Sequence, residues 1–255
     1  MLQTAIKAAK EAEKIILGYY DQVLKEERKA DHTLVTVADK NAEGMIREII
    51  LADYPNHKIL GEEEGQIGVG DSEYLWIVDP IDGTTNYHSH IPMFATSIAL
   101  YKNKEPLLAV INLPAWDKMI TAEKGKGTFL NGKRIHVSEK DELEYSLLSF
   151  GYGPGEEVRK KTAEIFSRFI TKTRTARIFG SQVVQGALVA IGETEAFIST
   201  GASKWDYAAT SLAVIEAGGL VTDLAGKIWT IDSTEFVAAG PKLHPKIIEV
   251  IGFGS

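Results

Sequence analysis

The sequence predicts an α+β protein made of two lobes that share one interface. Three observations lead to this prediction: an amphipathic first segment, a run of adjacent strand-like segments between residues 94 and 133, and a mixture of strand-like and helix-like segments after residue 146. Adjacent strands favour an antiparallel sheet, because parallel strands need a long crossover connection. The 255 residues, 44% of them apolar, are enough for one large domain or two lobes with a sizeable buried core.

The N-terminal part begins with two predicted helices and a short strand. Apolar residues at intervals of three and four predict an amphipathic helix over residues 2–25. The β-prone TLVTV at 33–37 precedes a second helix, which is entered at Asp39 and stopped by the Tyr-Pro-Asn sequence at 54–56. HKIL at 57–60 predicts a short strand that leads into GEEEG.

The same sequence patterns predict the strands, turns and helices in the rest of the chain. WIV at 76–78 predicts a buried strand that is broken abruptly at Asp79, and NGK at 131–133 predicts a hairpin turn. A polar segment at 137–146 divides the chain into predicted lobes 1–140 and 141–255. Further strands are expected at 94–101, 107–113, 118–124, 127–130, 146–150, 174–178, 195–199, 219–222 and 235–240, and helices at 156–170, 181–191, 206–217 and from His244 onward.

The composition narrows the classes of function. The absence of cysteine excludes disulfides and thiolate metal sites, so a bound metal would need oxygen or histidine ligands. The net charge of −7 and the lack of a basic tract make duplex nucleic acid an unsuitable partner. The N-terminus resembles neither a signal peptide nor a transit peptide, and the longest apolar runs are too short to span a bilayer. We therefore expect a soluble cytoplasmic protein that binds neither nucleic acid nor membrane.

Acidic residues recur where the secondary structure is expected to change. Each has an ordinary explanation: a helix N-terminus, a capping box between Ser203 and Asp206, a solvated loop of glutamates, or a simple turn at Asp82-Gly83. The acids are Asp39, Glu62, Glu63, Glu64, Asp79, Asp82 and Asp206.

The segment DPIDGTT at 79–85 is harder to explain as an ordinary turn. Pro80 stiffens the link between the two aspartates, Gly83 allows close approach of a ligand, and Thr84-Thr85 can open a helix whose N–H groups suit phosphate. Carboxylates would repel that phosphate by about 4 kcal/mol per charge pair at ~4 Å and an effective dielectric of ~20, so cations are required. Mg²⁺ bridges carboxylates and phosphate in this way, which predicts a Mg²⁺-dependent hydrolase of a phosphate ester.

Three motifs in this order, GEEEG, WIVDPIDGTTNY and SKWDYAATSLAVIEAGG, resemble the inositol monophosphatase family. This family belongs to the Mg²⁺-dependent, lithium-sensitive phosphatases, which include fructose-1,6-bisphosphatases. The resemblance extends from the first helix to AAGPKLHPKI near the C-terminus. It implies a layered α-β-α-β-α sugar-phosphatase fold with largely antiparallel and mixed sheets, a phosphoric monoester hydrolase, and a homodimer.

The resemblance also implies a ligand set for two or three Mg²⁺ ions. Glu62, Asp79 and the main-chain carbonyl of Ile81 match one metal site, and Asp79, Asp82 and Asp206 match the second. Glu62 also matches a position that helps to hold a weaker third ion through water. The N-terminal lobe would thus carry most ligands, and the C-terminal lobe would supply Asp206 and the substrate pocket.

The family pattern assigns catalytic roles to neighbouring positions. Asp39 and Thr84 match the pair that orients and deprotonates the attacking water, Glu62 completes the catalytic set, and Gly83 with Thr84 matches the turn that holds the phosphate. Glu63 matches a further acid beside the metal site. The implied mechanism is direct in-line attack of a metal-activated water on phosphorus, without a covalent phosphoenzyme. His88 and His90 are expected to cover the site or face solvent rather than bind Mg²⁺, which prefers oxygen.

The sequence indicates the class of reaction more closely than it indicates the substrate. Ser199 stands where inositol-specific members carry glutamate, and Gln182 stands where a small residue is common; both positions line the alcohol side of the pocket. Either Lys29 or Arg28 corresponds to the lysine of the family's mobile loop. The expected substrate-binding residues are Asp82, Gly83, Thr84, Gln182, Ser199 and Asp206.

Several functions remain open at this point. The expected substrate is a small phosphorylated metabolite, either inositol 1-phosphate or a related sugar or polyol phosphate. The alternatives are fructose 1,6-bisphosphate, histidinol phosphate, NADP and 3′-phosphoadenosine 5′-phosphate, or a non-catalytic regulator that keeps the fold.

Overall fold

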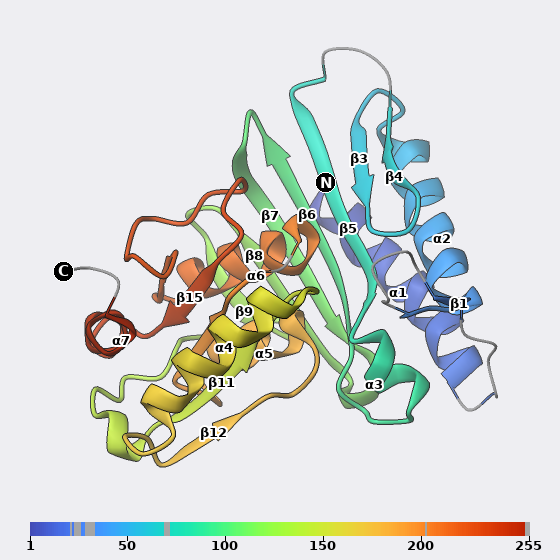
Figure 1. The fold of residues 1–255 in the computed structure, drawn as a ribbon. Helices are drawn as coiled ribbons and strands as arrows, with labels where there is room; N and C mark the ends of the chain where they lie inside the picture. The colour runs from blue at the N-terminus through green and yellow to red at the C-terminus, as the bar shows by residue number, and fades with distance from the viewer. Residues whose placement is uncertain (21, 23–26, 29–33, 69–71, 202, 253–255) are drawn as a thin grey trace.

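The computed structural model describes residues 1–20, 22, 27–28, 34–68, 72–201 and 203–252. Its elements stack as a helix pair, a large sheet, a second helix pair, a small sheet and a third helix pair (Figure 1). This order is the layered α-β-α-β-α arrangement that the resemblance to the inositol monophosphatase family implies. The division into lobes at residue 140 stays a prediction.

The outer layer beside the large sheet contains α1 (Leu2–Tyr20) and α2 (Val37–Asp53). Helix α1 is shorter than the predicted 2–25, because it ends at Tyr20 and Gln22 lies in a bend; residues 21 and 23–25 are outside the described part. The predicted strand 33–37 is also too long. Strand β2 (Leu34–Val35) ends before Thr36, because Thr36 caps α2 and Val37 already belongs to the helix; Thr33 is outside the described residues.

The large sheet has eight strands in the order β10-β9-β8-β7-β6-β5-β3-β4. All neighbours are antiparallel except β3 and β5, so the predicted antiparallel sheet is confirmed with one parallel pair. The strands are β3 (Lys58–Gly61), β4 (Gly65–Ile67), β5 (Tyr74–Asp82), β6 (Ala95–Lys102), β7 (Glu105–Leu113), β8 (Lys118–Glu123), β9 (Gly127–Leu130) and β10 (Lys133–Ile135).

Strand β5 carries the two aspartates of the DPID motif, and the prediction that it breaks at Asp79 is wrong. The strand continues to Asp82 through a register shift: Asp79 pairs with Ser97 and Asp82 pairs with Ala95, so β5 has one residue more than β6 over this stretch. Residues three apart in a regular strand point to opposite faces, and one extra residue corrects this parity. The bulge therefore lets both carboxylates reach the same side of the sheet.

The small sheet is mixed and has the order β12-β11-β13-β15-β14. Helices α5 and α6 pack between the two sheets, and α4 and α7 cover the outer face of the small sheet. Helix α6 begins two residues before the predicted 206, directly after its N-cap Ser203. The elements are β11 (Leu147–Gly151), α4 (Glu156–Phe169), β12 (Thr175–Arg177), α5 (Gln182–Ala190), β13 (Ala196–Ser199), α6 (Lys204–Glu216), β14 (Leu220–Thr222), β15 (Phe236–Ala239) and α7 (His244–Ile251).

Three apolar cores lie between the layers. Successive side chains of β5 point alternately into two of these cores. Trp76 and Val78 point into the core beneath α1 and α2, whereas Ile77 points into the core shared with α5 and α6. Both faces of the strand are therefore buried, which fixes its end beside the site. Over the described residues, no helix combines the length and apolar character needed to cross a bilayer.

Candidate active site

Asp79 lies at the bulge of β5 and is 1% exposed. Among the described residues, no N–H or hydroxyl group donates to either of its carboxylate oxygens, and the Glu62 carboxyl group lies within interaction range. Burial raises the pKa of Asp79 well above its ordinary value, and the nearby Glu62, Asp82 and Asp206 carboxylates raise it further. A buried carboxylate without a donor is costly unless a proton or a cation neutralises it.

Three acids converge at this point from two layers, Asp79 and Asp82 from β5 and Asp206 from α6. One oxygen each of Asp79, Asp82 and Asp206 lies within 4.8 Å of the others. Asp206 occupies the third position of α6, where it accepts the backbone N–H of Ser203 at 2.6 Å. The capping explanation of Asp206 is thus correct, and it is compatible with the site because one carboxylate can do both.

Asp82 is held by the N-terminus of α5. Its Oδ2 accepts the backbone N–H of Val183 at 2.8 Å and the hydroxyl of Ser181, and its Oδ1 accepts the N–H of Gln182 at 3.3 Å. Burial raises the pKa of Asp82 to about 6, while the bonds from Ser181 and Val183 oppose this rise. The start of a helix favours negative charge, so these donors fix the direction of the carboxylate.

Glu62 reaches the cluster from the neighbouring strand. Strands β3 and β5 run parallel, with Gly61 opposite Val78, and the N–H of Glu62 donates to the Val78 carbonyl at 3.2 Å. Glu62 and Asp79 therefore follow the same register position of two adjacent strands. The charge of the Glu62 carboxylate helps to raise the pKa values of Asp79, Asp39 and Asp82, so it lies near these three acids.

Asp39 and Thr84 meet beside these acids. Thr84 Oγ1 lies 3.4 Å from Asp39 Oδ1 and 3.1 Å from the carbonyl oxygen of Ile81. The other Asp39 oxygen accepts the N–H of Thr36 at 2.8 Å and its hydroxyl at 2.6 Å, as part of the capping box of α2. Burial raises the pKa of Asp39 to about 6, so the group is close to a proton-transfer range at neutral pH.

Gly83 separates the bulge from α3 (Thr84–His88) and has a backbone φ of 89°. A Cβ at this position would lie 2.9 Å from the Met93 carbonyl oxygen and 2.9 Å from Ser181 Cβ. No side chain fits there without a shift of the backbone. The glycine is therefore needed both for its left-handed conformation and for the close packing of the turn.

A model of the inositol monophosphatase family matches residues 1–253. The chain belongs to this family. It is a phosphatase, and the family acts on small phosphorylated substrates with the help of metal ions. The acidic cluster around Asp79 fits that use of metal.

Two relatives and one solved structure describe its place in the inositol monophosphatase family. The putative Nus factor SuhB of Neisseria meningitidis serogroup B is 36% identical over 98% of this chain and 97% of the relative. The fructose-1,6-bisphosphatase/inositol-1-monophosphatase of Thermotoga maritima is 34% identical over 98% and 95% of the two chains. The extragenic suppressor protein suhB of Bartonella henselae has a TM-score of 0.94 at 31% identity, covering 99% and 98%.

The two predicted alcohol-side residues lie in contact. Ser199 is fully buried, and its hydroxyl donates to Gln182 Oε1 at 3.1 Å. Gln182 Nε2 donates to the carbonyl of Tyr152 at 3.1 Å. Gly151 provides the space for this arrangement, since a Cβ there would lie 2.0 Å from Gln182 Oε1. Sequence reasoning missed Tyr152 and Ser181, although Ser181 has an N-cap signal before α5.

The remaining predicted positions are His90 and the two candidates for the loop lysine. His90 packs edge-on against the ring of Tyr20 with centroids 5.6 Å apart. Of the two candidates for the loop lysine, Lys29 is outside the described residues, and only the backbone of Arg28 is described, in β1 (Glu27–Arg28).

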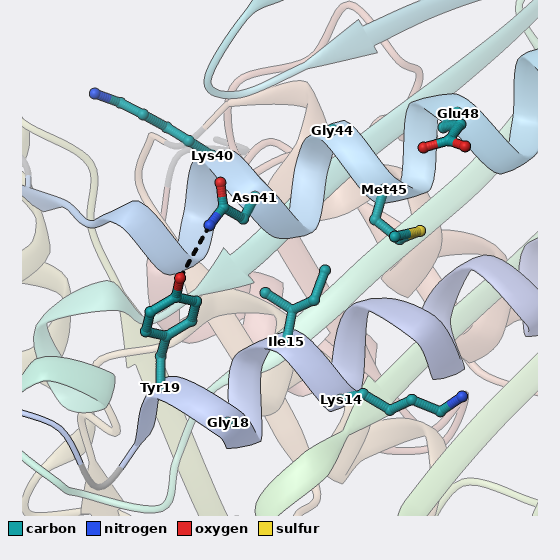
Figure 2. Close-up of a pocket in the computed structure, with 9 residues that line it drawn as sticks. All are labelled: Lys14, Ile15, Gly18, Tyr19, Lys40, Asn41, Gly44, Met45 and Glu48. Atoms are coloured by element: carbon teal, nitrogen blue, oxygen red, sulfur yellow. Dashed lines mark hydrogen bonds between the residues drawn. The ribbon is translucent and has the colours of Figure 1, made fainter.

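A groove of about 540 Å³ between α1 and α2 is separate from the acids (Figure 2). Asp39 and Glu43 are buried on the inner face of α2, whereas the groove follows its outer face. Across the groove, Asn41 Nδ2 donates to the hydroxyl of Tyr19 at 3.3 Å. The lining residues are Lys14, Ile15, Gly18, Tyr19, Lys40, Asn41, Gly44, Met45 and Glu48.

The raised pKa values predict how the stability of the metal-free protein depends on pH. For Asp39 and Asp82 the folded-state pKa is about 6 against an ordinary 3.8, so folding favours the protonated form. Their contribution to stability is fully present below the ordinary pKa and is lost as the pH rises through about 6. In EDTA, we expect the Tm to fall between pH 5 and pH 7, and Mg²⁺ to restore much of it at pH 7. A metal-free Tm that rises over this interval would contradict the prediction.

Proposed function

We propose that the protein is a Mg²⁺-dependent phosphomonoesterase that hydrolyses inositol 1-phosphate or a related sugar or polyol phosphate. One observation carries the proposal: the buried Asp79 carboxylate, without a hydrogen-bond donor in the described chain, among three further acids. Oxygen ligands of this kind suit Mg²⁺.

The residues that would hold the ions are the ones the family pattern indicates. Glu62, Asp79 and the carbonyl of Ile81 would form one site, and Asp79, Asp82 and Asp206 the other. When bound, Mg²⁺ neutralises the acids and the phosphate, activates a water and stabilises the leaving oxygen. Supporting this assignment, the Ile81 carbonyl and Asp39 share the hydroxyl of Thr84 as a donor.

The chain itself supplies proton transfer and orientation. Asp39 Oδ1 accepts the proton of Thr84 Oγ1, and Thr84 in turn accepts the proton of the attacking water. With a pKa of about 6, Asp39 is mostly ionised at neutral pH and can act as this base. The backbone at Gly83 and Thr84 would hold the phosphate in line with the attack, because Gly83 leaves no side chain in the way.

Metal dependence is the first test of the proposed function. Phosphate release from inositol 1-phosphate is expected to require Mg²⁺, to stop in EDTA and to be suppressed by Li⁺. A malachite-green assay across Mg²⁺ and Li⁺ concentrations measures this. Normal turnover in EDTA would refute the proposal, and tight phosphate-ester binding without turnover under any metal would favour a non-catalytic regulator.

We propose that the pocket accepts substrates other than inositol 1-phosphate as well. On its alcohol side the uncharged Gln182 accepts the hydroxyl of the buried Ser199, and the Thermotoga relative is named for two substrates. Fructose 1,6-bisphosphate is therefore the second candidate, followed by histidinol phosphate, NADP and 3′-phosphoadenosine 5′-phosphate.

Gln182→Ala tests whether this side of the pocket selects the alcohol. We expect the ratio of kcat/KM between inositol 1-phosphate and fructose 1,6-bisphosphate to change by roughly 10-fold, the effect of one pocket contact, without a change in Mg²⁺ dependence. Gln66→Ala, an exposed change on β4, serves as the control. An unchanged ratio would exclude Gln182 from substrate selection.

We further propose that the protein is a cytoplasmic homodimer without nucleic-acid or membrane partners. The net charge of −7 supports the absence of a nucleic-acid partner, because nucleic-acid affinity depends on basic side chains. Relatives named as Nus factors make nucleic acid the partner to test against this proposal.

A further inference from the structure

Glu43 is a buried acid that the proposed mechanism does not use. It lies on α2 one turn after Asp39 and is 0% exposed. Its Oε2 accepts the backbone N–H of Glu63 at 2.8 Å, and its Oε1 accepts the N–H of Glu64 at 3.1 Å. The carboxylate thus binds the two peptide groups that directly follow Glu62.

Arg47 completes this arrangement from the next turn of the helix. Its Nε and Nη2 donate to Glu43 Oε1 at 2.9 and 2.6 Å, and Nη2 also donates to the carbonyl of Gly65 at 2.8 Å. The turn between β3 and β4 is therefore fastened at both ends to α2, which lies beside it (Figure 1). A buried, hydrogen-bonded ion pair of this type keeps a fixed geometry.

Gly61 allows the Glu43 carboxylate to approach the strand. A Cβ on Gly61 would lie 2.3 Å from Glu43 Oε1, so only glycine leaves room directly before Glu62. On the other side, the N–H of Glu62 is bound to the Val78 carbonyl. The backbone of Glu62 is consequently held by β5 and by α2 together.

We propose that Glu43 and Arg47 are positioning residues that hold Glu62 toward the acid cluster and thereby set the affinity for the divalent cation. Glu62 and Asp79 follow the same register position of β3 and β5, so their like charges would push an unrestrained turn away when no cation is bound. Glu43 and Arg47 resist this movement, so the ligand geometry exists before the cation arrives. This inference rests on the proposed role of Glu62 as a metal ligand.

Glu43→Gln tests the inference with a nearly isosteric change. The Mg²⁺ affinity, measured by calorimetry with Mg²⁺ alone and by the Mg²⁺-induced rise in Tm, is expected to fall about 10- to 100-fold, as for residues that support a metal ligand. The kcat at saturating Mg²⁺ is expected to stay within about threefold, since the ligands themselves are unchanged. Arg47→Lys keeps the positive charge but loses the planar guanidinium that donates two hydrogen bonds to Glu43. We expect this variant to weaken Mg²⁺ binding as well.

Glu195→Gln is the matched control. Glu195 is also buried, at 4% exposure, and it accepts the N–H of Leu147 at 2.6 Å and pairs with Lys140 at 3.0 Å. We expect this variant to lower the Tm without changing Mg²⁺ affinity.

Unchanged Mg²⁺ affinity in Glu43→Gln would show a purely structural role and overturn the inference. If that variant does not fold, Arg47→Lys decides by the same measurement. If the unaltered chain itself binds no Mg²⁺, the proposed function fails instead, so the two failures are distinguishable.

Discussion

Asp79→Asn is expected to abolish phosphate release and yet to raise the Tm of the metal-free protein. The loss should reach roughly 10³-fold, because metal-assisted charge stabilisation contributes several kcal/mol and each 1.36 kcal/mol is tenfold in rate. The gain in stability has a separate cause. Asparagine removes a buried charge that lacks a donor in the described chain and is repelled by Glu62, Asp82 and Asp206.

Thermal unfolding in EDTA and in Mg²⁺ measures both effects. Each kcal/mol gained corresponds to about 2–4 °C in Tm for a chain of this size. In Mg²⁺ the order is expected to reverse, because the unaltered chain gains stability from the bound cation. Asp232→Asn is the control: this exposed acid pairs with Lys104 and Lys204, and its loss should leave activity unchanged. A lower metal-free Tm for Asp79→Asn than for the unaltered chain would contradict the claim that the buried Asp79 charge destabilises the metal-free protein.

The fold was predictable where local patterns decide it. The strands from β6 to β9 and the helices α4 to α6 follow alternation or three-to-four spacing, and their positions agree with the predicted ones within a few residues. The continuation of β5 through Asp79 could not be predicted in this way. It depends on β6 as a pairing partner on both sides of the bulge, where Pro80 has no N–H to donate and its carbonyl accepts the Thr96 hydroxyl at 2.8 Å.

The candidate site, like the fold, could be predicted from the sequence only in part. The acids were predictable as residue types at element boundaries, and the structure brings Asp79, Asp82 and Asp206 together. The supporting contacts were not predictable. Glu43 is one of several charged residues on α2, and only its burial against the turn distinguishes it from a solvated helix residue. Its spacing of four from Asp39, on an inward face, is the one signal in the sequence.

Asp39→Asn is expected to lower kcat by about 10² to 10⁴-fold, the usual contribution of a general base, while Mg²⁺ affinity stays unchanged. The asparagine carbonyl can still accept the N–H of Thr36, so the helix cap is largely kept. Single-turnover phosphate release at saturating Mg²⁺ measures the effect. Asp53→Asn is the control on the same helix: it removes the negative charge from the acceptor of the Thr4 hydroxyl, 2.7 Å away, and should leave kcat unchanged.

Thr84 allows a sharper version of this test. If Asp39 acts through the Thr84 hydroxyl, Thr84→Val and Asp39→Asn interrupt the same proton transfer, and the double variant should lose little more than the more damaging single one. Thr84→Ser retains the hydroxyl and should keep most of the activity. Separate, additive losses would mean that Thr84 orients the phosphate while Asp39 works alone. The 3.4 Å contact between Thr84 Oγ1 and Asp39 Oδ1, shared with the Ile81 carbonyl, favours the non-additive result.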